Sequence, residues 1–157
     1  MHQPIQIGKL TITFLQSRHE TQGAADVFEL LIPPHAHLNI PHLHRESEET
    51  VFAMNGITTW IVDQRKITLH PGQHLRIPRG TVHSYLNDQQ QTARIICLLT
   101  PGLLGPEYFH ELSRILKAED PPNLADIGSV MAHYDVIPAG LPSPPVQDHG
   151  PLILTLP

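Results

Sequence analysis

The sequence predicts an all-β fold, an antiparallel sandwich or barrel, from its N-terminus to about residue 100. About eight short runs of β-branched, aromatic and aliphatic residues follow one another, and several alternate apolar with polar side chains. Turn-forming pairs such as Asn55-Gly56 and Pro71-Gly72 separate them. Many short strands at this spacing are typical of a sandwich or barrel, and 157 residues suffice for one domain with its own core.

The expected strands can be justified in chain order. Residues 9–16 alternate leucine, isoleucine and phenylalanine with threonine, which is the period-two pattern of a half-buried strand. Residues 26–32 place Phe28 and Leu30 on one face and Glu29 on the other. The remaining runs are equally short and rich in strand-forming residues, and they lie at residues 50–55, 58–63, 66–69, 73–78, 81–87 and 93–100.

Two of the turns between these strands have a specific predicted geometry. Pro71 and Gly72 suit the two central positions of a type II turn, where proline presets φ and glycine accepts a positive φ. Pro78 and Gly80 suit the second and fourth positions of a type I turn.

The pattern changes after residue 100. Residues 105–120 carry apolar side chains at helical spacing, with Pro106 near the start, where a helix tolerates proline. Residues 121–136 predict a second short helix, and from Pro138 onward the chain is proline-rich, with residues 152–156 as a candidate edge strand. We therefore expect a barrel over residues 1–104, a helical extension packed on it over residues 105–135, and a C-terminal tail over residues 136–157.

Composition and charge argue against several classes of function. A net charge of −5 and a pI of about 6.1 give no support to a nucleic-acid-binding surface. No apolar run approaches the roughly 18 residues of a membrane span, and the N-terminus lacks the pattern of a signal peptide. The single cysteine, Cys97, lies in an apolar run and excludes a disulfide within the chain. We expect a cytoplasmic protein with a buried thiol.

Histidine is the unusual residue of this chain: there are 12, and four fall within ten positions, namely His35, His37, His42 and His44. Residues two apart on a strand share a face, so His42 and His44 can reach one ion if the segment is extended, as Pro41 favours. An isolated pair of this kind is more often part of a hydrated loop. A further histidine, His83, follows a tight turn in a later strand and strengthens the case for a metal site.

The alternation of side chains along a strand does not identify which glutamate would join these histidines. Glu49 lies five positions after His44, which is the wrong parity for one face of an unbroken strand, whereas Glu46 and Glu48 have the right parity. Glu49 is a candidate ligand only if a turn or bulge resets the phase.

Together these residues resemble the cupin superfamily, whose motifs are G(X)5HXH(X)3–4E(X)6G and G(X)5PXG(X)2H(X)3N. The second motif is complete at the family spacing, in Gly72, Pro78, Gly80, His83 and Asn87. The first motif matches in His42, His44, Glu49 and Gly56.

The first motif also selects among the acidic residues and shows one departure. Its six-residue gap before Gly56 selects Glu49 over Glu48. Ala36 stands where the family has the opening glycine, which affects the local backbone more than the metal site. The helical segment is similar to the C-terminal extension of small bacterial single-domain cupins, including quercetin dioxygenase-like members.

The resemblance implies a double-stranded β-helix, or jelly-roll, cupin barrel that holds one divalent ion inside. The implied ligands are His42, His44, Glu49 and His83, and such donors suit Fe, Mn, Ni, Cu, Co or Zn. Four protein ligands leave positions open on a five- or six-coordinate ion, whereas a tetrahedral zinc would be closed and structural.

The strand pattern also predicts the walls of a pocket around this ion. We expect an apolar lining that includes Phe28, Leu30, Val51, Trp60 and Tyr85. Three of the histidines outside the motifs also have an expected place. His35 and His37 are expected to be exposed, with a weaker second metal site as the alternative, and His74 is expected to face the core.

The most specific functional hypothesis is a metal-dependent, dioxygenase-like oxidoreductase that acts on a small organic enol, diketone or flavonol-like substrate. Glu49 would be either the fourth ligand or, released from the metal, the catalytic base. The alternatives are a non-catalytic module that binds a small molecule or metal, and an isomerase or lyase that uses the metal as a Lewis acid. We expect a homodimer, in which the strand at residues 9–16 is a candidate for pairing across subunits.

Overall fold

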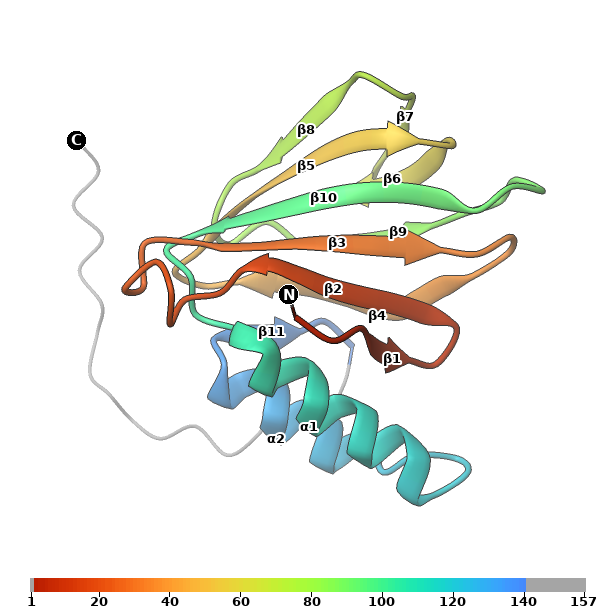
Figure 1. Cartoon of the computed structure of the whole chain (residues 1–157). Helices are drawn as coiled ribbons and strands as arrows, with labels where there is room; N and C mark the ends of the chain where they lie inside the picture. The colour runs from red at the N-terminus through yellow and green to blue at the C-terminus, as the bar shows by residue number, and fades with distance from the viewer. Residues whose placement is uncertain (1, 141–157) are drawn as a thin grey trace.

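The computed structural model describes residues 2–140, except for the side chains of residues 38 and 39. Strands form most of the ordered elements: β1 (Ile5–Ile7), β2 (Leu10–Gln16), β3 (Asp26–Ile32), β4 (His37–His44), β5 (Glu48–Asn55), β6 (Thr58–Val62), β7 (Arg65–Leu69), β8 (His74–Ile77), β9 (His83–Leu86), β10 (Ala93–Thr100) and β11 (Val136–Pro138). Two helices, α1 (Gly105–Ala118) and α2 (Leu124–His133), lie between β10 and β11 (Figure 1). The candidate strand at residues 152–156 lies outside the described residues.

The strands form two antiparallel sheets that face each other. The six-stranded sheet has the order β1-β2-β3-β10-β5-β8 and faces the viewer in Figure 1, and the five-stranded sheet, β11-β4-β9-β6-β7, lies behind it. Strands that are consecutive in the chain, such as β3, β4 and β5, alternate between the sheets. This is the jelly-roll arrangement, and the predicted all-β fold is confirmed.

The core between the sheets follows the alternation seen in the sequence. Along β3 and β10 every second side chain is buried, and these two central strands pair with Phe28 opposite Cys97 and Leu30 opposite Ile95. Ile32, Ile95 and Cys97 are at most 1% exposed. Burial of one face of each sheet therefore sets the register, because a slip by one residue would turn the apolar side chains to solvent.

The two turns with a predicted geometry have different outcomes. Pro71 and Gly72 form the expected type II turn, in which Gly72 has φ +84° and the Gln73 N–H donates to the His70 carbonyl at 3.0 Å. The second turn differs from the prediction. The Thr81 N–H donates to the Pro78 carbonyl at 3.2 Å, so Gly80, with φ +76°, is at the third position and supplies a left-handed residue.

The segment before β4 shows how the chain accommodates Ala36. The Ala36 N–H donates to the Pro33 carbonyl at 3.1 Å, and the left-handed position of this turn is occupied by His35, with φ +58°. Ala36 itself is buried and accepts a hydrogen bond from the Asn87 N–H at 2.9 Å. The replacement of the family glycine is therefore tolerated because the strained conformation lies one residue earlier.

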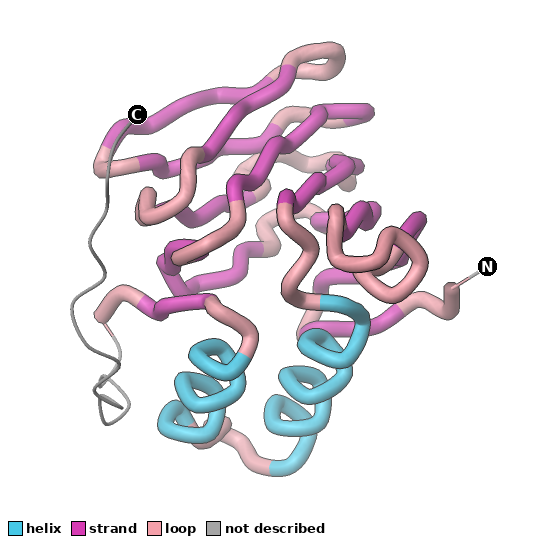
Figure 2. Tube along the Cα trace, turned by 90° about the vertical axis from the view of Figure 1, so that its left-hand side faces the viewer, coloured by secondary structure: helices cyan, strands magenta, loops and turns pink. Residues whose placement is uncertain are grey.

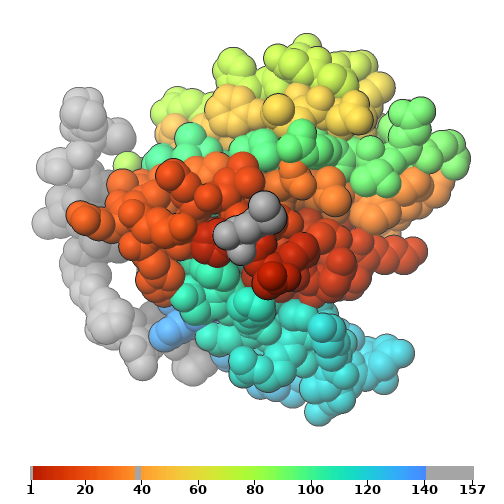
Figure 3. Space-filling view, viewed as in Figure 1, coloured from red at the N-terminus to blue at the C-terminus, as the bar shows by residue number. Residues whose placement is uncertain are grey.

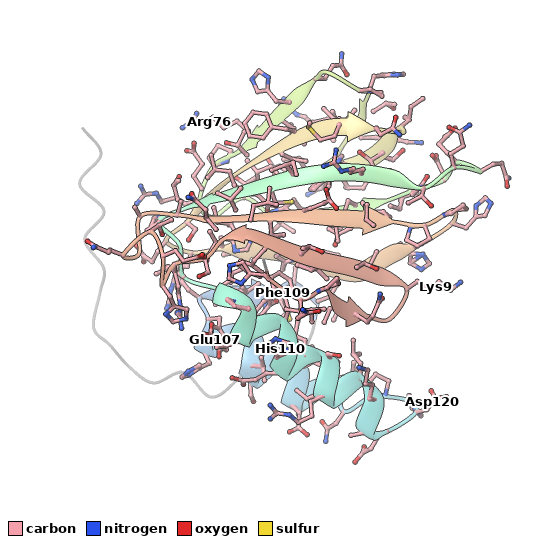
Figure 4. The ribbon with its side chains drawn as sticks, in the orientation of Figure 1. Lys9, Arg76, Glu107, Phe109, His110 and Asp120 are labelled. Carbon is pink, nitrogen blue, oxygen red and sulfur yellow. The ribbon has the colours of Figure 1, made fainter. Side chains whose placement is uncertain are left out.

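Both helices pack at one end of the sandwich, beside β1 and β11 (Figure 2). The Phe109 ring of α1 lies 5.8 Å from the Phe14 ring and 5.2 Å from the Phe28 ring, between the helix and the first sheet (Figure 4). In the space-filling view α1 lies directly against the β1–β2 segment (Figure 3). Neither helix in the described part of the chain has the length and apolar character needed to cross a membrane.

A buried carboxylate fixes the start of α1. Asp26, which is 0% exposed, accepts hydrogen bonds from the backbone N–H groups of Leu104 at 2.9 Å, Gly105 at 3.1 Å and Arg18 at 2.6 Å. An acceptor at the first turn satisfies N–H groups that have no partner inside the helix. Asp26 therefore ties α1 to the beginning of β3.

The edges of β2 and β4 are covered within the chain. β2 pairs with β1 on one side and β3 on the other, so the strand expected to pair across subunits has no free edge. β11 pairs with β4, with Val136 opposite His44 and Pro138 opposite His42. Residues 136–138, placed by the sequence in the tail, thus form the outer strand beside the two histidines.

Candidate metal centre

The four residues selected by the sequence motifs meet inside the sandwich. His42 and His44 lie on β4, His83 lies on the neighbouring strand β9, and Glu49 lies on β5 of the opposite sheet. His42 is the direct register partner of His83. The three candidate ligand atoms of the histidines lie within 4.8 Å of one another. The structure therefore brings together side chains from three strands and two sheets.

Glu49 completes the cluster from across the sandwich. One of its carboxylate oxygens, Oε2, lies 3.0 Å from Nε2 of His83 and 3.4 Å from Nε2 of His44. Its neighbours point elsewhere: Glu48 pairs with Arg76 on the surface at 2.5 Å, and Glu46 is exposed. Because His44 and Glu49 belong to different sheets, the parity argument along a single strand does not apply to them.

Two of the imidazoles are oriented by backbone carbonyls. Nδ1 of His42 lies 2.9 Å from the Ile40 oxygen, and Nδ1 of His83 lies 2.9 Å from the Thr81 oxygen. A carbonyl oxygen can only accept, so each Nδ1 carries the proton and each Nε2 keeps its lone pair for the centre of the cluster. This is the orientation that metal-binding histidines adopt in proteins.

A buried nitrogen without a hydrogen-bond partner marks the same place. Nε2 of His83 is fully buried and, despite its 3.0 Å approach to Glu49, has no hydrogen bond of acceptable geometry with the described residues. A buried polar atom without a partner is costly, so it is expected to serve a ligand. Three imidazoles and one carboxylate are donors that first-row transition metals accept, and the residues present therefore fit a divalent ion.

The electrostatics of the cluster keep two of its donors, His42 and Glu49, in the forms that bind metals. Burial, together with the neighbouring His83 and His44, lowers the pKa of His42 to about 3. Burial alone would raise the pKa of Glu49, but its contacts with His44 and His83 outweigh this and hold the pKa well below its usual range. At neutral pH His42 is neutral and Glu49 is ionised, as metal binding requires.

Two other groups near the cluster keep their protons. Burial, followed by the charge of Glu49, raises the pKa of Tyr108, and burial also raises that of Cys97 well above its usual range. Cys97 therefore remains a thiol, as expected for a buried core residue, and does not supply the thiolate that a metal ligand needs.

A small cavity of about 50 Å³ adjoins the cluster. Among the pocket residues predicted from the sequence, Phe28, Leu30 and Tyr85 line it together with all four candidate ligands. Val51 and Trp60 do not line it. Both are fully buried, and the Trp60 indole N–H donates to the Thr58 hydroxyl at 3.0 Å, so these side chains support the walls from within the core.

The sequence interpretation missed the part of the wall that comes from outside the central strands. Tyr108, Phe109 and Leu112 of α1 line the cavity, as do Ile7 of β1 and Leu10 of β2. The helical spacing of Tyr108 and Leu112 indicates an apolar face, but a periodic pattern does not reveal which cavity that face covers.

The remaining histidines lie outside the cluster. His35 and His37 are exposed, as expected, beside a separate surface pocket that also contains Lys9. His74 is also exposed, contrary to the prediction that it faces the core. The reason is strand parity, since His74 lies three positions before the buried Ile77 and points to the opposite face.

Comparison with known proteins gives results that agree with this geometry. The family model described as "Cupin domain" matches residues 28–99, which span β3 to β10. Quercetin 2,3-dioxygenase of Bacillus subtilis (strain 168) is 37% identical over 67 residues, which cover 43% of this chain and 20% of that protein. The chain thus matches only about a fifth of the length of this relative.

Three solved structures with the same fold have low sequence identity. KdgF from Halomonas sp. has a TM-score of 0.57 at 16% identity, covering 64% of this chain and 86% of its own. A predicted oxalate decarboxylase from Thermotoga maritima has 0.58 at 15%, covering 63% and 90%. A sugar phosphate isomerase from Silicibacter pomeroyi has 0.54 at 20%, covering 62% of each chain. At these identities the likeness concerns the fold alone.

Proposed function

Because residues 28–99 form a cupin domain, which places the chain in the cupin superfamily, we propose that it is a metal-dependent, dioxygenase-like enzyme acting on a small enol or diketone. The observation that carries the proposal is the cluster of three imidazoles and one carboxylate at the end of an apolar cavity. The local similarity of the chain to a quercetin 2,3-dioxygenase also supports the proposal.

The chain's own residues have separate roles in this proposal. His42, His44 and His83 hold one divalent transition metal ion, and Glu49 is either its fourth ligand or a base beside it. A bound redox-active metal supplies the electron transfer to dioxygen that oxygenation requires. The Glu49 carboxylate lines the cavity, so it is placed beside an enol hydroxyl bound there.

The apolar wall contributes by excluding water from the reacting groups. Phe28, Leu30, Phe109 and Leu112 surround the polar cluster from β3 and α1. In such an environment the charge of Glu49 acts with less screening than it would in water.

Cavity size decides between the substrate types. A site for one water molecule needs roughly 10–15 Å³ on the same measure, so about 50 Å³ admits a group of only a few non-hydrogen atoms. Sites for drug-sized ligands have volumes of about 300–1,000 Å³. A tricyclic flavonol exceeds this volume, so a small enol or diketone is the preferred substrate class.

The same donors would also serve the two alternative functions. An isomerase or lyase would use the metal as a Lewis acid and turn over without dioxygen, and a sugar phosphate isomerase and a predicted oxalate decarboxylase share the fold. A binding module would hold metal and ligand without turnover. The position of the Glu49 carboxylate in a mostly apolar cavity beside the histidines favours catalysis over simple binding.

The first experiment measures bound metal in the purified protein and in a His42→Ala, His83→Ala double variant, with His74→Ala as the control. The proposal expects about one transition metal ion per chain, lost in the double variant and kept in the control, because His74 is exposed and outside the cluster. Equal metal content in all three proteins would contradict the proposed site.

The second experiment measures oxygen uptake with a panel of enols and small diketones by protein reconstituted with iron, manganese, nickel, copper or cobalt. Uptake that is proportional to substrate consumption supports the dioxygenase. Consumption of substrate under anaerobic conditions indicates the Lewis-acid alternative, and stoichiometric binding without consumption indicates the binding module. A cytoplasmic location and a homodimer stay predictions from the sequence.

A further inference from the structure

Two tyrosines line the cavity beside the candidate metal centre. Tyr85 comes from β9 and Tyr108 comes from α1, and both line the cavity that contains Glu49. Neither hydroxyl forms a hydrogen bond with a side chain or backbone group of the described residues, although Tyr108 is only 6% exposed. Tyr134, the third tyrosine, differs because its hydroxyl donates to Glu111 at 2.6 Å. Tyr85 is half-buried and Tyr108 is buried, and the hydroxyl of a tyrosine in such a position usually finds a partner. Two unbonded hydroxyls on residues that line one cavity therefore indicate donors kept for a ligand.

The positions of both rings are fixed by neighbouring aromatic side chains. The Tyr85 ring lies 5.0 Å from the Trp60 ring, which is itself 0% exposed. The Tyr108 ring lies 5.0 Å from Phe109 and 5.5 Å from Tyr134. A donor on a fixed ring loses little conformational freedom when it binds, so each hydroxyl is preorganised for an oxygen atom placed in the cavity.

The charge of the cavity limits which oxygen-containing molecules fit. No lysine or arginine is among the described residues that line it, and Glu49 is its one carboxylate. A divalent ion held with Glu49 would leave one net positive charge, which an uncharged ketone or enol does not change. A dicarboxylate or a phosphate ester would instead leave a net negative charge in apolar surroundings, which is costly without a cationic partner.

We propose that Tyr85 and Tyr108 are the hydrogen-bond donors that bind the oxygen atoms of a small, uncharged ketone or enol substrate, and that they exclude dianionic substrates. This inference rests on the proposed function, because it concerns the ligand of the same site. It assigns Tyr108, which lies outside the matched family region, a direct contact with substrate.

The test measures ligand binding by calorimetry to protein reconstituted with zinc, an ion that does not change its oxidation state and so prevents oxygenation. The probes are pentane-2,4-dione and malonate, which have similar size and oxygen spacing but differ in charge. The variants are Tyr85→Phe and Tyr108→Phe, which keep the rings, and Tyr134→Phe is the matched control because its hydroxyl is bonded to Glu111. Near-ultraviolet circular dichroism checks that the aromatic packing is retained.

Wild-type protein is expected to bind the dione at least about tenfold more tightly than malonate, because the dianion leaves an unpaired buried charge. Each cavity substitution is expected to weaken dione binding about three- to tenfold, as one hydrogen bond is lost, and Tyr134→Phe is expected to leave it unchanged. Tighter binding of malonate, or dione affinity unaltered in both cavity variants, would overturn the inference. Titrations of zinc and of the dione into metal-free protein separate the two proposals. A failure to bind zinc would contradict the metal centre, whereas the dependence of dione binding on the two tyrosines still tests the donors.

Discussion

His42 and His83 are direct partners in the β4–β9 ladder, and each donates its Nδ1–H at 2.9 Å to the carbonyl of the residue two positions before it. The two rings are thus oriented by the same local geometry on adjacent strands. Their centroids lie 4.5 Å apart, and both Nε2 atoms remain available to one ion. Preorganisation of this kind reduces the cost of assembling a metal site.

Replacement of Glu49 by glutamine is expected to lower the affinity for zinc or manganese by at least about tenfold, because the change removes the one negative charge facing the histidines while keeping the shape of the side chain. Competition with a chromophoric chelator measures the effect. Glu48→Gln is the control, since that carboxylate binds Arg76 on the surface. Equal losses in the two variants would show that general charge, and not the cluster, determines affinity.

The metal-free protein is expected to lose stability as the pH falls from 6.5 to 5. His42 has a pKa of about 3 in the folded state against 6.5 as the ordinary value, so in this window the unfolded chain binds a proton and the folded chain does not. Stability tied to this group therefore decreases with decreasing pH, by up to about 2 kcal/mol over the window.

Urea denaturation of chelator-treated protein at both pH values measures the loss at low pH. His42→Gln is expected to remove most of this dependence, and His74→Gln, at an exposed position, is expected to retain it. An identical pH dependence in wild type and His42→Gln would count against a neutral, buried His42. His83 does not contribute the same trend, because its contact with Glu49 overcomes burial and raises its pKa, which favours the folded state at lower pH.

Gly56→Ala is expected to lower the free energy of unfolding by about 2–4 kcal/mol, since Gly56 has φ +71° and an added Cβ would lie 2.8 Å from Cα of Ala93. Gly72→Ala is the matched control, with φ +84° but no atom within 4 Å of the added Cβ, and should lose only about 1 kcal/mol. Chemical denaturation compares the two variants. Losses of equal size would mean that backbone strain alone, and not the close approach of Gly56 to Ala93 on β10, determines the loss of stability.

Asp26→Ala is expected to destabilise the protein by about 2–4 kcal/mol, because three backbone N–H groups lose their common acceptor. Hydrogen exchange should show the loss of protection concentrated in the first turn of α1. Asp88→Ala, at an exposed position, should change stability by less than about 0.5 kcal/mol. Unchanged exchange in α1 would show that its packing against the barrel, and not Asp26, holds this helix.

Local patterns in the sequence predicted eight of the strands but did not mark out β1, β4 or β11, and the four candidate ligands came from the resemblance to the cupin motifs. Alternation along β3 and β10 follows directly from burial of one face, and motif spacing selected Glu49 where parity alone favoured Glu46 or Glu48. Parity failed there because it holds only along one strand, whereas Glu49 approaches His44 from the other sheet.

Features that depend on contacts between distant segments were less predictable. The turn after Pro78 is shifted by one position from the prediction, because Gly80 takes the left-handed place. Closure of the cavity by Tyr108 and Leu112 requires knowledge of where α1 lies, and a helical pattern carries no such information. Trp60 was expected in the pocket but is enclosed between its neighbours in the core.

The candidate ligands and one wall of the cavity come from different parts of the chain. All four candidate ligands come from β4, β5 and β9, whereas one wall of the cavity belongs to α1, which follows the last of those strands in the chain. Mutations or insertions after residue 104 can therefore change the shape of this wall without changing the four candidate ligands. The helix is thus the part of this molecule whose sequence can vary with the least effect on the candidate metal centre.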